Sequence, residues 1–152
     1  MKCAEIMTPD PKMCISEDDV AVAVNLMWDY DCGDVPVVKD LQGKELIGMV
    51  TDRDIAIHVV KHAYAHPSQV KVGACMSSPV ITCKPEDPVE KAIQLMGEHR
   101  IRRVPIVDED GCCVGVVSQT DLLSYTTNTE PVINMLRQIS APHGCDITDT
   151  SH

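Results

Sequence analysis

The amino-acid sequence predicts an α+β fold built from two copies of one β-α-β-β-α unit. Two observations lead to this prediction. The chain matches itself when it is shifted by 69 residues, and each copy passes through the same order of strand-like and helix-like apolar patterns. The 152 residues are 44% apolar, so each half has enough apolar side chains to contribute to a packed core.

The internal repeat is the strongest of these signals. Residues 7–38 align with residues 76–107 and share 11 identities in 32 positions, where chance gives about two. After a difference of two residues in length, 48–54 align with 115–121. We therefore divide the chain into repeat 1 (3–64), a linker (65–72), repeat 2 (73–125) and a C-terminal extension (126–152).

The first two elements of each unit are a strand and a helix. Short extended stretches are expected at 12–15 and 80–83, and Asp18 and Asp87 then stand where a helix cap is expected. Apolar residues follow at i, i+3, i+4 and i+7, which predicts one buried helical face. Its members are Val20, Ala23, Val24 and Met27 in the first copy and Val89, Ala92, Ile93 and Met96 in the second.

A hairpin and a second helix complete each unit. Two β-rich runs flank a Gly-containing turn in each copy, which predicts a β-hairpin. The paired runs are 34–39 with 45–50 and 104–108 with 113–117. The second helices are expected to open at Thr51 and Ser118. A further helix is predicted over 131–139, followed by a loose tail over 141–152.

Composition excludes several classes of function. The formal net charge is -10, the wrong sign for a protein that neutralises nucleic-acid phosphates or anionic lipid. Aromatic residues make up only 3%, so stacking platforms for single-stranded nucleic acid are not expected. No apolar run is long enough to span a bilayer, and no secretory signal is evident. We expect a cytoplasmic protein that binds neither nucleic acid nor membranes.

The sequence contains no nucleophile elbow, P-loop or HExxH motif, so we do not expect an enzyme. The eight cysteines include no CxxC pair, and we interpret most of them as reduced thiols. Cys14 and Cys83 occupy equivalent positions and are expected to be small buried side chains. Cys112 and Cys113 are the better candidates for oxidation.

Three histidines suggest a metal site as an alternative. His58, His62 and His66 follow each other at intervals of four residues, and two His one helical turn apart can chelate a transition metal. Three such residues drift around a helix, however, and Pro67 ends it. We favour an exposed polar stripe and keep a metal- or redox-responsive protein as a rival function.

The repeated motifs resemble the CBS domain family, whose members occur as tandem pairs called Bateman modules. The resemblance covers about residues 3–125 and includes stand-alone CBS-pair proteins. It rests on Met-Thr-Pro at 7–9 and Met-Ser-Ser-Pro at 76–79, on the hydrophobic-Pro strands at 35–38 and 104–107, and on Gly-x-Val-[Thr/Ser]-x-x-Asp closing each hairpin. It implies two CBS units packed as a pseudo-twofold pair.

This resemblance implies a regulatory module that binds AMP, ADP, ATP, NAD or S-adenosylmethionine in clefts between the repeats. The Asp of the motif would hold the ribose, the Thr or Ser would contact phosphate, and the hydrophobic-Pro segment would line the adenine slot. These residues are Val35, Pro36, Thr51 and Asp54 for one cleft and Val104, Pro105, Ser118 and Asp121 for the other, with Val80 as a further contact. A homodimer is implied, and an effector protein would act in trans. No cofactor is obligatory.

Elementary chemistry is consistent with these roles but leaves an alternative open. A carboxylate can accept two hydrogen bonds from a diol, and a helix N-terminus favours phosphate. The same Ser/Thr-x-x-Asp pattern is close to a capping box, in which both side chains satisfy the helix and bind nothing. The rival function is then a ligand-free structural or interaction module.

The two sites are not expected to be equivalent. The second hydrophobic-Pro strand is preceded by Arg100, Arg102 and Arg103, where the first repeat has Asp31, Gly33 and Asp34. Arginine attracts phosphate and acids repel it. We therefore expect one preferred nucleotide per chain, near Ser118 and Asp121. Arg53, in the first motif, is a separate candidate for contacting a phosphate. The alternative is that the arginines form a solvated face.

Overall fold

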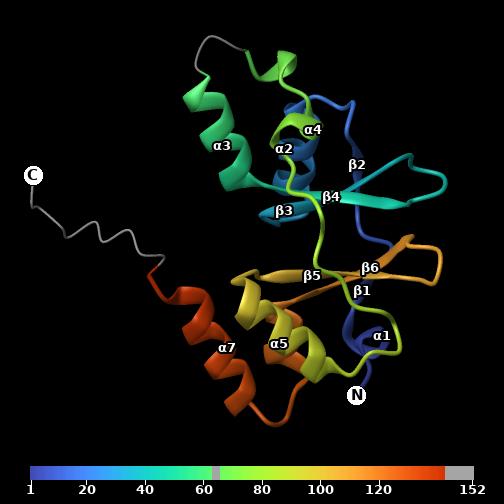
Figure 1. Ribbon diagram of the computed structural model, residues 1–152, viewed down its shortest axis with the longest axis vertical. Helices are drawn as coiled ribbons and strands as arrows, with labels where there is room; N and C mark the ends of the chain where they lie inside the picture. Colours follow the sequence, from blue (N-terminus) through green and yellow to red (C-terminus); the bar gives the residue numbers. More distant parts are fainter. Residues whose placement is uncertain (63–65, 143–152) are drawn as a thin grey trace, which may run out of the picture.

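The computed structural model describes residues 1–62 and 66–142, and they form two halves, each with one three-stranded sheet (Figure 1). The first sheet has the order β2 (Cys14–Ile15), β3 (Asp34–Val38), β4 (Leu46–Thr51). The second has the order β1 (Thr8–Pro9), β6 (Cys113–Ser118), β5 (Arg103–Val107). β2 runs parallel to β3, and the other pairs are antiparallel. The predicted α+β class and both hairpins are confirmed. The extended stretch expected at 12–15 is a strand only at Cys14–Ile15, and the one expected at 80–83 is not a strand, since only Cys83 forms an isolated bridge there, to Ile106.

The helices also repeat. The first half carries α2 (Val20–Asp29) and α3 (Asp52–Lys61), and the second carries α5 (Val89–His99) and α6 (Gln119–Tyr125). The shorter helices are α1 (Cys3–Ile6), η1 (Pro67–Gln69) and α4 (Val72–Cys75). The expected C-terminal helix is present as α7 (Glu130–Ser140). Most of the predicted tail, residues 143–152, lies outside the described residues.

The opening segment of each repeat packs against the other repeat. β1, from the start of the chain, pairs with β6 of repeat 2, and Ser77 bridges to Met49 of repeat 1. The hydrogen bonds repeat this exchange with an offset of 69 residues: the amide of Val20 donates to the carbonyl of Val70 at 2.9 Å, and the amide of Val89 donates to the carbonyl of Met1 at 3.0 Å. The two halves are therefore related by a pseudo-twofold axis.

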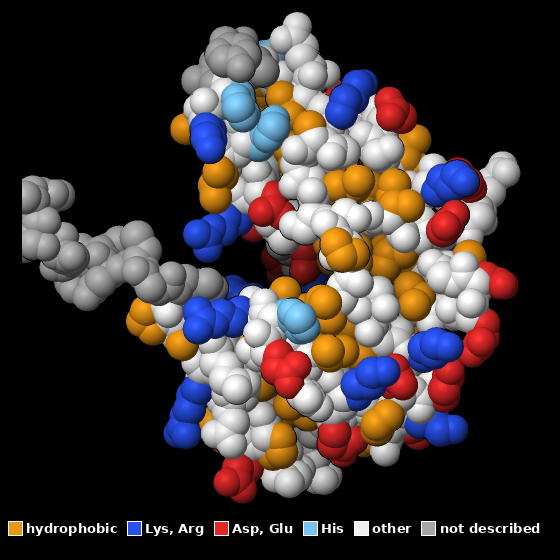
Figure 2. All heavy atoms as spheres, viewed as in Figure 1, with side chains coloured by type: hydrophobic (Ala, Val, Ile, Leu, Met, Phe, Trp, Pro, Cys, Tyr) orange, Lys and Arg blue, Asp and Glu red, His pale blue; other side chains and the backbone are white. Residues whose placement is uncertain are grey.

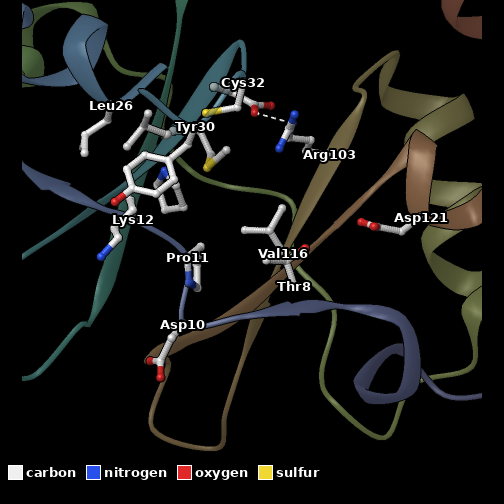
Figure 3. A pocket seen from close by; sticks show the side chains of 14 residues that line it. Thr8, Asp10, Pro11, Lys12, Leu26, Tyr30, Cys32, Arg103, Val116 and Asp121 are labelled. Carbon is white, nitrogen blue, oxygen red and sulfur yellow. Dashed lines mark ion pairs between the residues drawn. The ribbon is translucent and has the colours of Figure 1, made fainter. Parts of the chain in front are cut away.

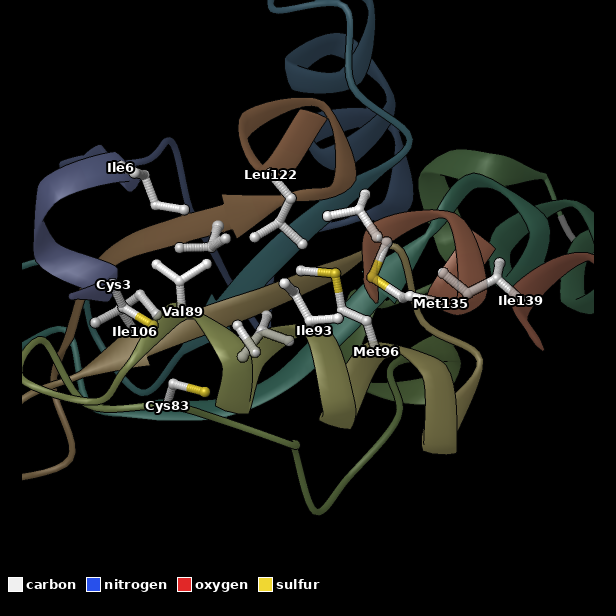
Figure 4. Packing of buried hydrophobic residues seen from close by; sticks show 14 residues of the cluster. Cys3, Ile6, Cys83, Val89, Ile93, Met96, Ile106, Leu122, Met135 and Ile139 are labelled. Atoms are coloured by element: carbon white, nitrogen blue, oxygen red, sulfur yellow. The ribbon is translucent and has the colours of Figure 1, made fainter. Parts of the chain in front are cut away.

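Each hydrophobic core contains side chains from the exchanged segment. Cys3 and Ile6 of α1 lie in the core of the second half, beside Val89 and Ile106 (Figure 4). Val72 and Cys75 take the corresponding places in the first half. The predicted helix faces are largely confirmed, except that Val24 is exposed. Cys14 and Cys83 are buried, as expected for small apolar side chains.

The methionine of each opening motif explains a glycine in the opposite sheet. Gly115 on β6 faces the thioether of Met7, and Gly48 on β4 faces the thioether of Met76. A Cβ atom at either glycine would collide with the sulfur. The Met-Thr-Pro and Met-Ser-Ser-Pro motifs are thus packing elements that hold the exchanged segments on the sheets.

The prediction that Asp18 and Asp87 cap the first helices is wrong by one residue. Asp19 caps α2, accepting from the amides of Ala21 and Val22, while the N-cap of α5 is Pro88. Asp18 and Asp87 instead accept from the amides three residues earlier, at 2.9 and 2.8 Å. Pro88 is extended at ψ 147°, so the helix starts after it. Its first amide is satisfied by Met1 rather than by a side chain.

The C-terminal helix breaks the symmetry of the two halves. α7 packs along α5 and buries Val132, Met135 and Ile139 (Figure 4). Gly97 of α5 lies against Gln138 and the backbone of Met135, so a side chain there would meet α7. The equivalent position on α2 is Trp28, whose surface is 86% exposed.

Candidate ligand-binding clefts

Two cavities lie where the repeats meet, with volumes of about 580 and 330 Å³. Both fall in the usual range for small-molecule sites, about 300 to 1,000 Å³. We call the larger one the arginine cleft, defined by Thr51, Asp52, Arg53, Pro79, Val80, Ile81, Arg100, Arg102, Arg103, Pro105 and Ser118. The smaller is the tyrosine cleft, defined by Asp10, Pro11, Lys12, Tyr30, Cys32, Asp34, Val35, Pro36, Arg103 and Asp121.

The arginine cleft is the more positive of the two. Its lining contains four arginines, at 53, 100, 102 and 103, against two acids, Asp34 and Asp52. The space-filling view shows a hollow between the two halves with basic and acidic side chains around it (Figure 2). The start of α3 contributes Thr51 to Arg53 to one side, and the segment 79–81 with Pro105 forms an apolar stretch. This is a surface that can hold a flat apolar group and an anion together.

The tyrosine cleft has the opposite charge balance. Asp121 of α6 approaches from one repeat, while Lys12 and Tyr30 approach from the other (Figure 3). The Lys12 ammonium lies 5.5 Å from the centre of the Tyr30 ring, within the range of a cation–π contact. Three acids, at 10, 34 and 121, face two bases, Lys12 and Arg103, and Asp10 is also paired with Lys44 at 2.9 Å. An anion is therefore less favoured here than in the arginine cleft.

The tyrosine cleft combines the hydrophobic-Pro strand of repeat 1 with the helix start of repeat 2, whereas the arginine cleft combines the hydrophobic-Pro strand of repeat 2 with the helix starts of both repeats. Val35 and Pro36 of repeat 1 lie with Asp121 of repeat 2, and Pro105 of repeat 2 lies with Thr51 of repeat 1. The grouping by repeat that the sequence suggested therefore holds for Pro105 with Ser118, but Thr51 and Asp121 each lie in the cleft that contains the opposite repeat's hydrophobic-Pro strand.

The arrangement also separates residues that the sequence analysis placed at one site. Ser118, Arg102 and Arg103 line the arginine cleft, but Asp121 lines the tyrosine cleft. A single ligand near both Ser118 and Asp121, held by all three arginines, does not fit this division. The expected difference between the sites remains, but it lies between clefts that both repeats build.

The two Ser/Thr-x-x-Asp motifs are used differently as helix caps. Ser118 and Asp121 form a closed capping box: Asp121 accepts from the Ser118 amide and hydroxyl, both at 2.7 Å, and the Asp121 amide donates back to the hydroxyl at 3.2 Å. At α3 only one of these bonds forms, from the Asp54 amide to the Thr51 hydroxyl at 3.0 Å. The capping interpretation is thus correct for both hydroxyls, and it engages the carboxylate only at Asp121.

An ion pair separates the two clefts. Arg103 Nε lies 2.6 Å from Asp34 Oδ1, and both residues line both cavities (Figure 3). They open β5 and β3 and stand 69 residues apart, so they are equivalent positions that meet at the pseudo-twofold axis. Burial raises the pKa of Asp34, and the neighbouring Arg103 opposes that rise.

Two residues that were predicted to contact a ligand do not line a cleft, and several residues that do line one were not predicted. Val104 is fully buried, and Asp54 lines neither cleft. The charge of Asp54 is the second cause, after burial, of the raised pKa of Cys75. The sequence analysis missed Lys12, Tyr30 and Ile139. The 69-residue register could have indicated Lys12, since it aligns with Ile81, next to Val80. Ile139 comes from α7, outside the repeat, and no sequence signal connects it with the cleft.

The predicted histidine stripe is wrong at its third member. α3 ends at Lys61, and His66 caps η1, where its Nδ1 lies 2.8 Å from the Ser68 hydroxyl. The rings of His58 and His62 do come together, 4.7 Å apart. Over residues 1–62 and 66–142, no three His, Cys, Asp or Glu side chains are grouped to hold a metal ion.

The vicinal thiols carry no sign of activation. Burial raises the pKa of Cys113 to about 11, and the pKa of Cys112 is also raised, by burial and then by Asp108. A thiol with a raised pKa is a poor nucleophile at neutral pH. Oxidation at this pair stays a prediction that these surroundings disfavour.

The fold and the paired clefts define a duplicated α+β module with ligand-sized cavities between its repeats. The model of the CBS domain family matches residues 3–61 and 72–128, and the chain therefore belongs to that family.

Relatives and solved structures agree with this assignment. The CBS domain-containing protein YhcV of Bacillus subtilis is 37% identical over 136 residues, which cover 90% of this chain and 89% of YhcV. The structure of Hypoxic Response Protein I with two coordinated zinc ions has a TM-score of 0.74 at 25% identity, covering 83% of this chain and 99% of that one. The CBS domain pair of MJ0100 in complex with 5′-methylthioadenosine and S-adenosylmethionine has a TM-score of 0.71 at 25% identity, covering 82% and 94%.

Among the described residues, none of the helices combines the length and apolar character that crossing a membrane requires. The longest, α5 and α7, have 11 residues each, against about 20 for a spanning helix.

Proposed function

We propose that this protein is a non-catalytic sensor that binds an adenosine-containing ligand between its repeats, with the phosphate of that ligand in the arginine cleft. The observation that carries the proposal is the convergence of Arg53, Arg100, Arg102 and Arg103 on one cavity with an apolar wall. The MJ0100 domain pair, a structural neighbour, was solved with two adenosyl compounds. That precedent supports the ligand class and leaves the particular ligand to experiment.

The chemistry of the arginine cleft matches a nucleotide. Guanidinium groups bind phosphate through paired, charge-assisted hydrogen bonds. The start of α3 adds the positive end of a ten-residue helix. Its first three amides already donate to Gly33, Asp52 and Thr51. Opposite this helix start, Val80 and Pro105 offer an apolar wall for the adenine. We assign Thr51, Arg53, Arg102, Arg103 and Ser118 to the phosphate side.

The tyrosine cleft suits a different member of the same ligand class. Val35 and Pro36 provide its apolar strand, and Asp121 has a second carboxylate oxygen beyond the one used in the cap. A carboxylate of this kind can accept hydrogen bonds from ribose hydroxyls. Since acids outnumber bases here, we assign this cleft to an adenosyl ligand without phosphate. A ribose contact for Asp54 at the arginine cleft stays a prediction.

We further propose that the protein works as a homodimer and signals in the cytoplasm to an effector protein in trans. Support for the dimer comes from apolar side chains left exposed on the helices of repeat 1, including Val24, Trp28, Ile57 and Val60. The corresponding helix of repeat 2 is covered by α7. Light scattering of the Trp28→Glu variant tests this: wild type is expected at twice the monomer mass and the variant at the monomer mass, and a monomeric wild type would refute it.

Ligand-dependent melting tests the function itself. Wild-type protein is heated with AMP, ADP, ATP, NAD, S-adenosylmethionine or adenosine. A ligand at 100 times its Kd stabilises the folded state by about 2.7 kcal/mol, a shift of several degrees. Arg102→Gln is expected to remove the shift caused by ADP, whereas Lys12→Gln, a matched change in the other cleft, is expected to keep it.

The closed cap at Ser118 and Asp121 favours the second candidate function, a structural module that binds nothing. In that case none of the six compounds changes the melting temperature. Equal loss of the ADP shift in Arg102→Gln and Lys12→Gln would instead contradict the assignment of phosphate to the arginine cleft.

A further inference from the structure

The ion pair between Asp34 and Arg103 lies at the boundary of the two clefts, and both residues line both of them. Arg103 is one of four arginines facing the larger cavity, and Asp34 is one of three acids facing the smaller. Their side chains are 31% and 15% exposed, so water reaches the arginine more easily than the acid. A charged ligand in one cleft therefore changes how strongly Asp34 and Arg103 interact with a charged ligand in the other cleft.

The carboxylate of Asp34 is incompletely satisfied. Its Oδ1 is buried and, among the described residues, receives no hydrogen bond of good geometry, although Arg103 Nε lies 2.6 Å away. A buried carboxylate depends on its compensating charge far more than an exposed one. The raised pKa of Asp34 has the same cause, since Arg103 only partly offsets the cost of burial.

A phosphate in the arginine cleft would compete with Asp34 for the Arg103 guanidinium. Each charge-assisted hydrogen bond that Arg103 makes to the ligand weakens its compensation of Asp34. The carboxylate then gains more from a positive charge on its other side, in the tyrosine cleft. A negative charge placed there would meet Asp34 together with Asp121, whereas Asp10 is paired with Lys44 at 2.9 Å.

We infer that Asp34 and Arg103 couple the two clefts, so that an anionic ligand in the arginine cleft favours a cationic ligand in the tyrosine cleft and disfavours a second anionic one. The inference rests on the proposed function and adds its regulation. Coupling of this kind is reciprocal: each ligand raises the affinity of the other by the same factor. The protein would then report the joint presence of two adenosyl compounds of opposite charge.

Calorimetric titration tests the coupling with ADP as the anionic probe. The Kd of ADP is measured alone, with saturating S-adenosylmethionine, which carries a sulfonium charge, and with saturating S-adenosylhomocysteine, which lacks only the sulfonium methyl and its positive charge. We expect S-adenosylmethionine to lower the Kd of ADP about fivefold or more relative to S-adenosylhomocysteine. In Asp34→Asn, which is isosteric and uncharged, the two compounds are expected to act equally.

The outcomes separate the coupling from the proposed function. If ADP binds with the same Kd in the presence of either adenosyl compound, the coupling is overturned and the proposed function is left intact. Displacement of ADP by S-adenosylmethionine also overturns the coupling, because the two would then share one cleft. A fivefold effect that persists in Asp34→Asn overturns the role of this pair. Absence of ADP binding to wild type overturns both proposals.

Discussion

The two repeats share a backbone and differ in a few equivalent side chains that decide what each half can do. Position 34 is an acid where position 103 is an arginine, and position 28 is an exposed tryptophan where position 97 is a glycine beneath α7. The Thr51 motif leaves its carboxylate out of the cap, while the Ser118 motif closes the capping box. A duplicated scaffold can thus keep its packing and specialise its clefts.

The pair at 34 and 103 shows most clearly how such a difference arises. Equivalent residues meet at a pseudo-twofold axis, so two identical charges there would repel each other across 2.6 Å. Opposite charges turn the same contact into an ion pair. The pair gives the arginine cleft and the tyrosine cleft a common boundary with a positive and a negative member.

The largest difference in the free energy of unfolding is expected when the residues at 28 and 97 are each replaced by the residue found at the other position. In Gly97→Trp the indole would occupy the space of Gln138 and force α7 from α5, lowering the free energy of unfolding by about 3 kcal/mol. Trp28→Gly, compared with the monomeric variant Trp28→Glu, should cost about 0.5 kcal/mol through helix propensity, because the side chain at this position is exposed in the single chain. Urea denaturation measures both, and equal effects would mean that α7 does not depend on this contact.

Removing one member of the central ion pair should have the next largest effect. Arg103→Met leaves Asp34 buried without its counter-charge, and we expect a loss of about 2 kcal/mol in the free energy of unfolding. Adding Asp34→Asn to that variant should restore most of the loss, because no buried charge then remains. A double variant no more stable than Arg103→Met would show that the pair is not coupled in the folded state.

The caps offer a smaller contrast. Ser118→Ala removes a hydroxyl that bonds both the Asp121 amide and its carboxylate, whereas Thr51→Ala removes only one bond. We expect losses of about 1.5 kcal/mol for Ser118→Ala and about 1 kcal/mol for Thr51→Ala by chemical denaturation. A larger loss at Thr51 would indicate that the two motifs are not capped in the way described.

The smallest expected effect is a pH dependence at Asp34. Because the pKa of Asp34 is raised in the folded state, mainly by burial, the folded protein binds this proton more tightly than the unfolded chain. Wild type should therefore gain stability relative to Asp34→Asn as the pH falls from neutral through that pKa, and lose it as the pH rises again. Denaturation of both proteins across this range measures the difference, and a constant difference would contradict the raised pKa.

The sequence predicted the repeated elements because local patterns determine them. The β-rich runs around the Gly-containing turns located both hairpins, and the end of α7 differs from its expected position by one residue. The caps of α2 and α5 were missed because Met1 and Val70, distant in sequence, satisfy the first amides of those helices. No local rule contains that information.

The candidate site was predicted in its residue types and not in its grouping. Pro36, Thr51, Pro105 and Asp121 all line a cavity, but Thr51 and Asp121 lie beside the hydrophobic-Pro strand of the opposite repeat. That pairing depends on the exchange of the opening segments, which is a long-range property. The contribution of Ile139 depends on how α7 docks, and the repeat says nothing about it.

The most direct test of the difference between the clefts is the stoichiometry of ADP binding by calorimetry, in wild type and in the double variant Arg53→Gln/Arg102→Gln. The account predicts one ADP per chain in wild type and a Kd raised about tenfold or more in the double variant, since each lost arginine removes charge-assisted hydrogen bonds. Two equal sites per chain, or an unchanged Kd in the double variant, would contradict it.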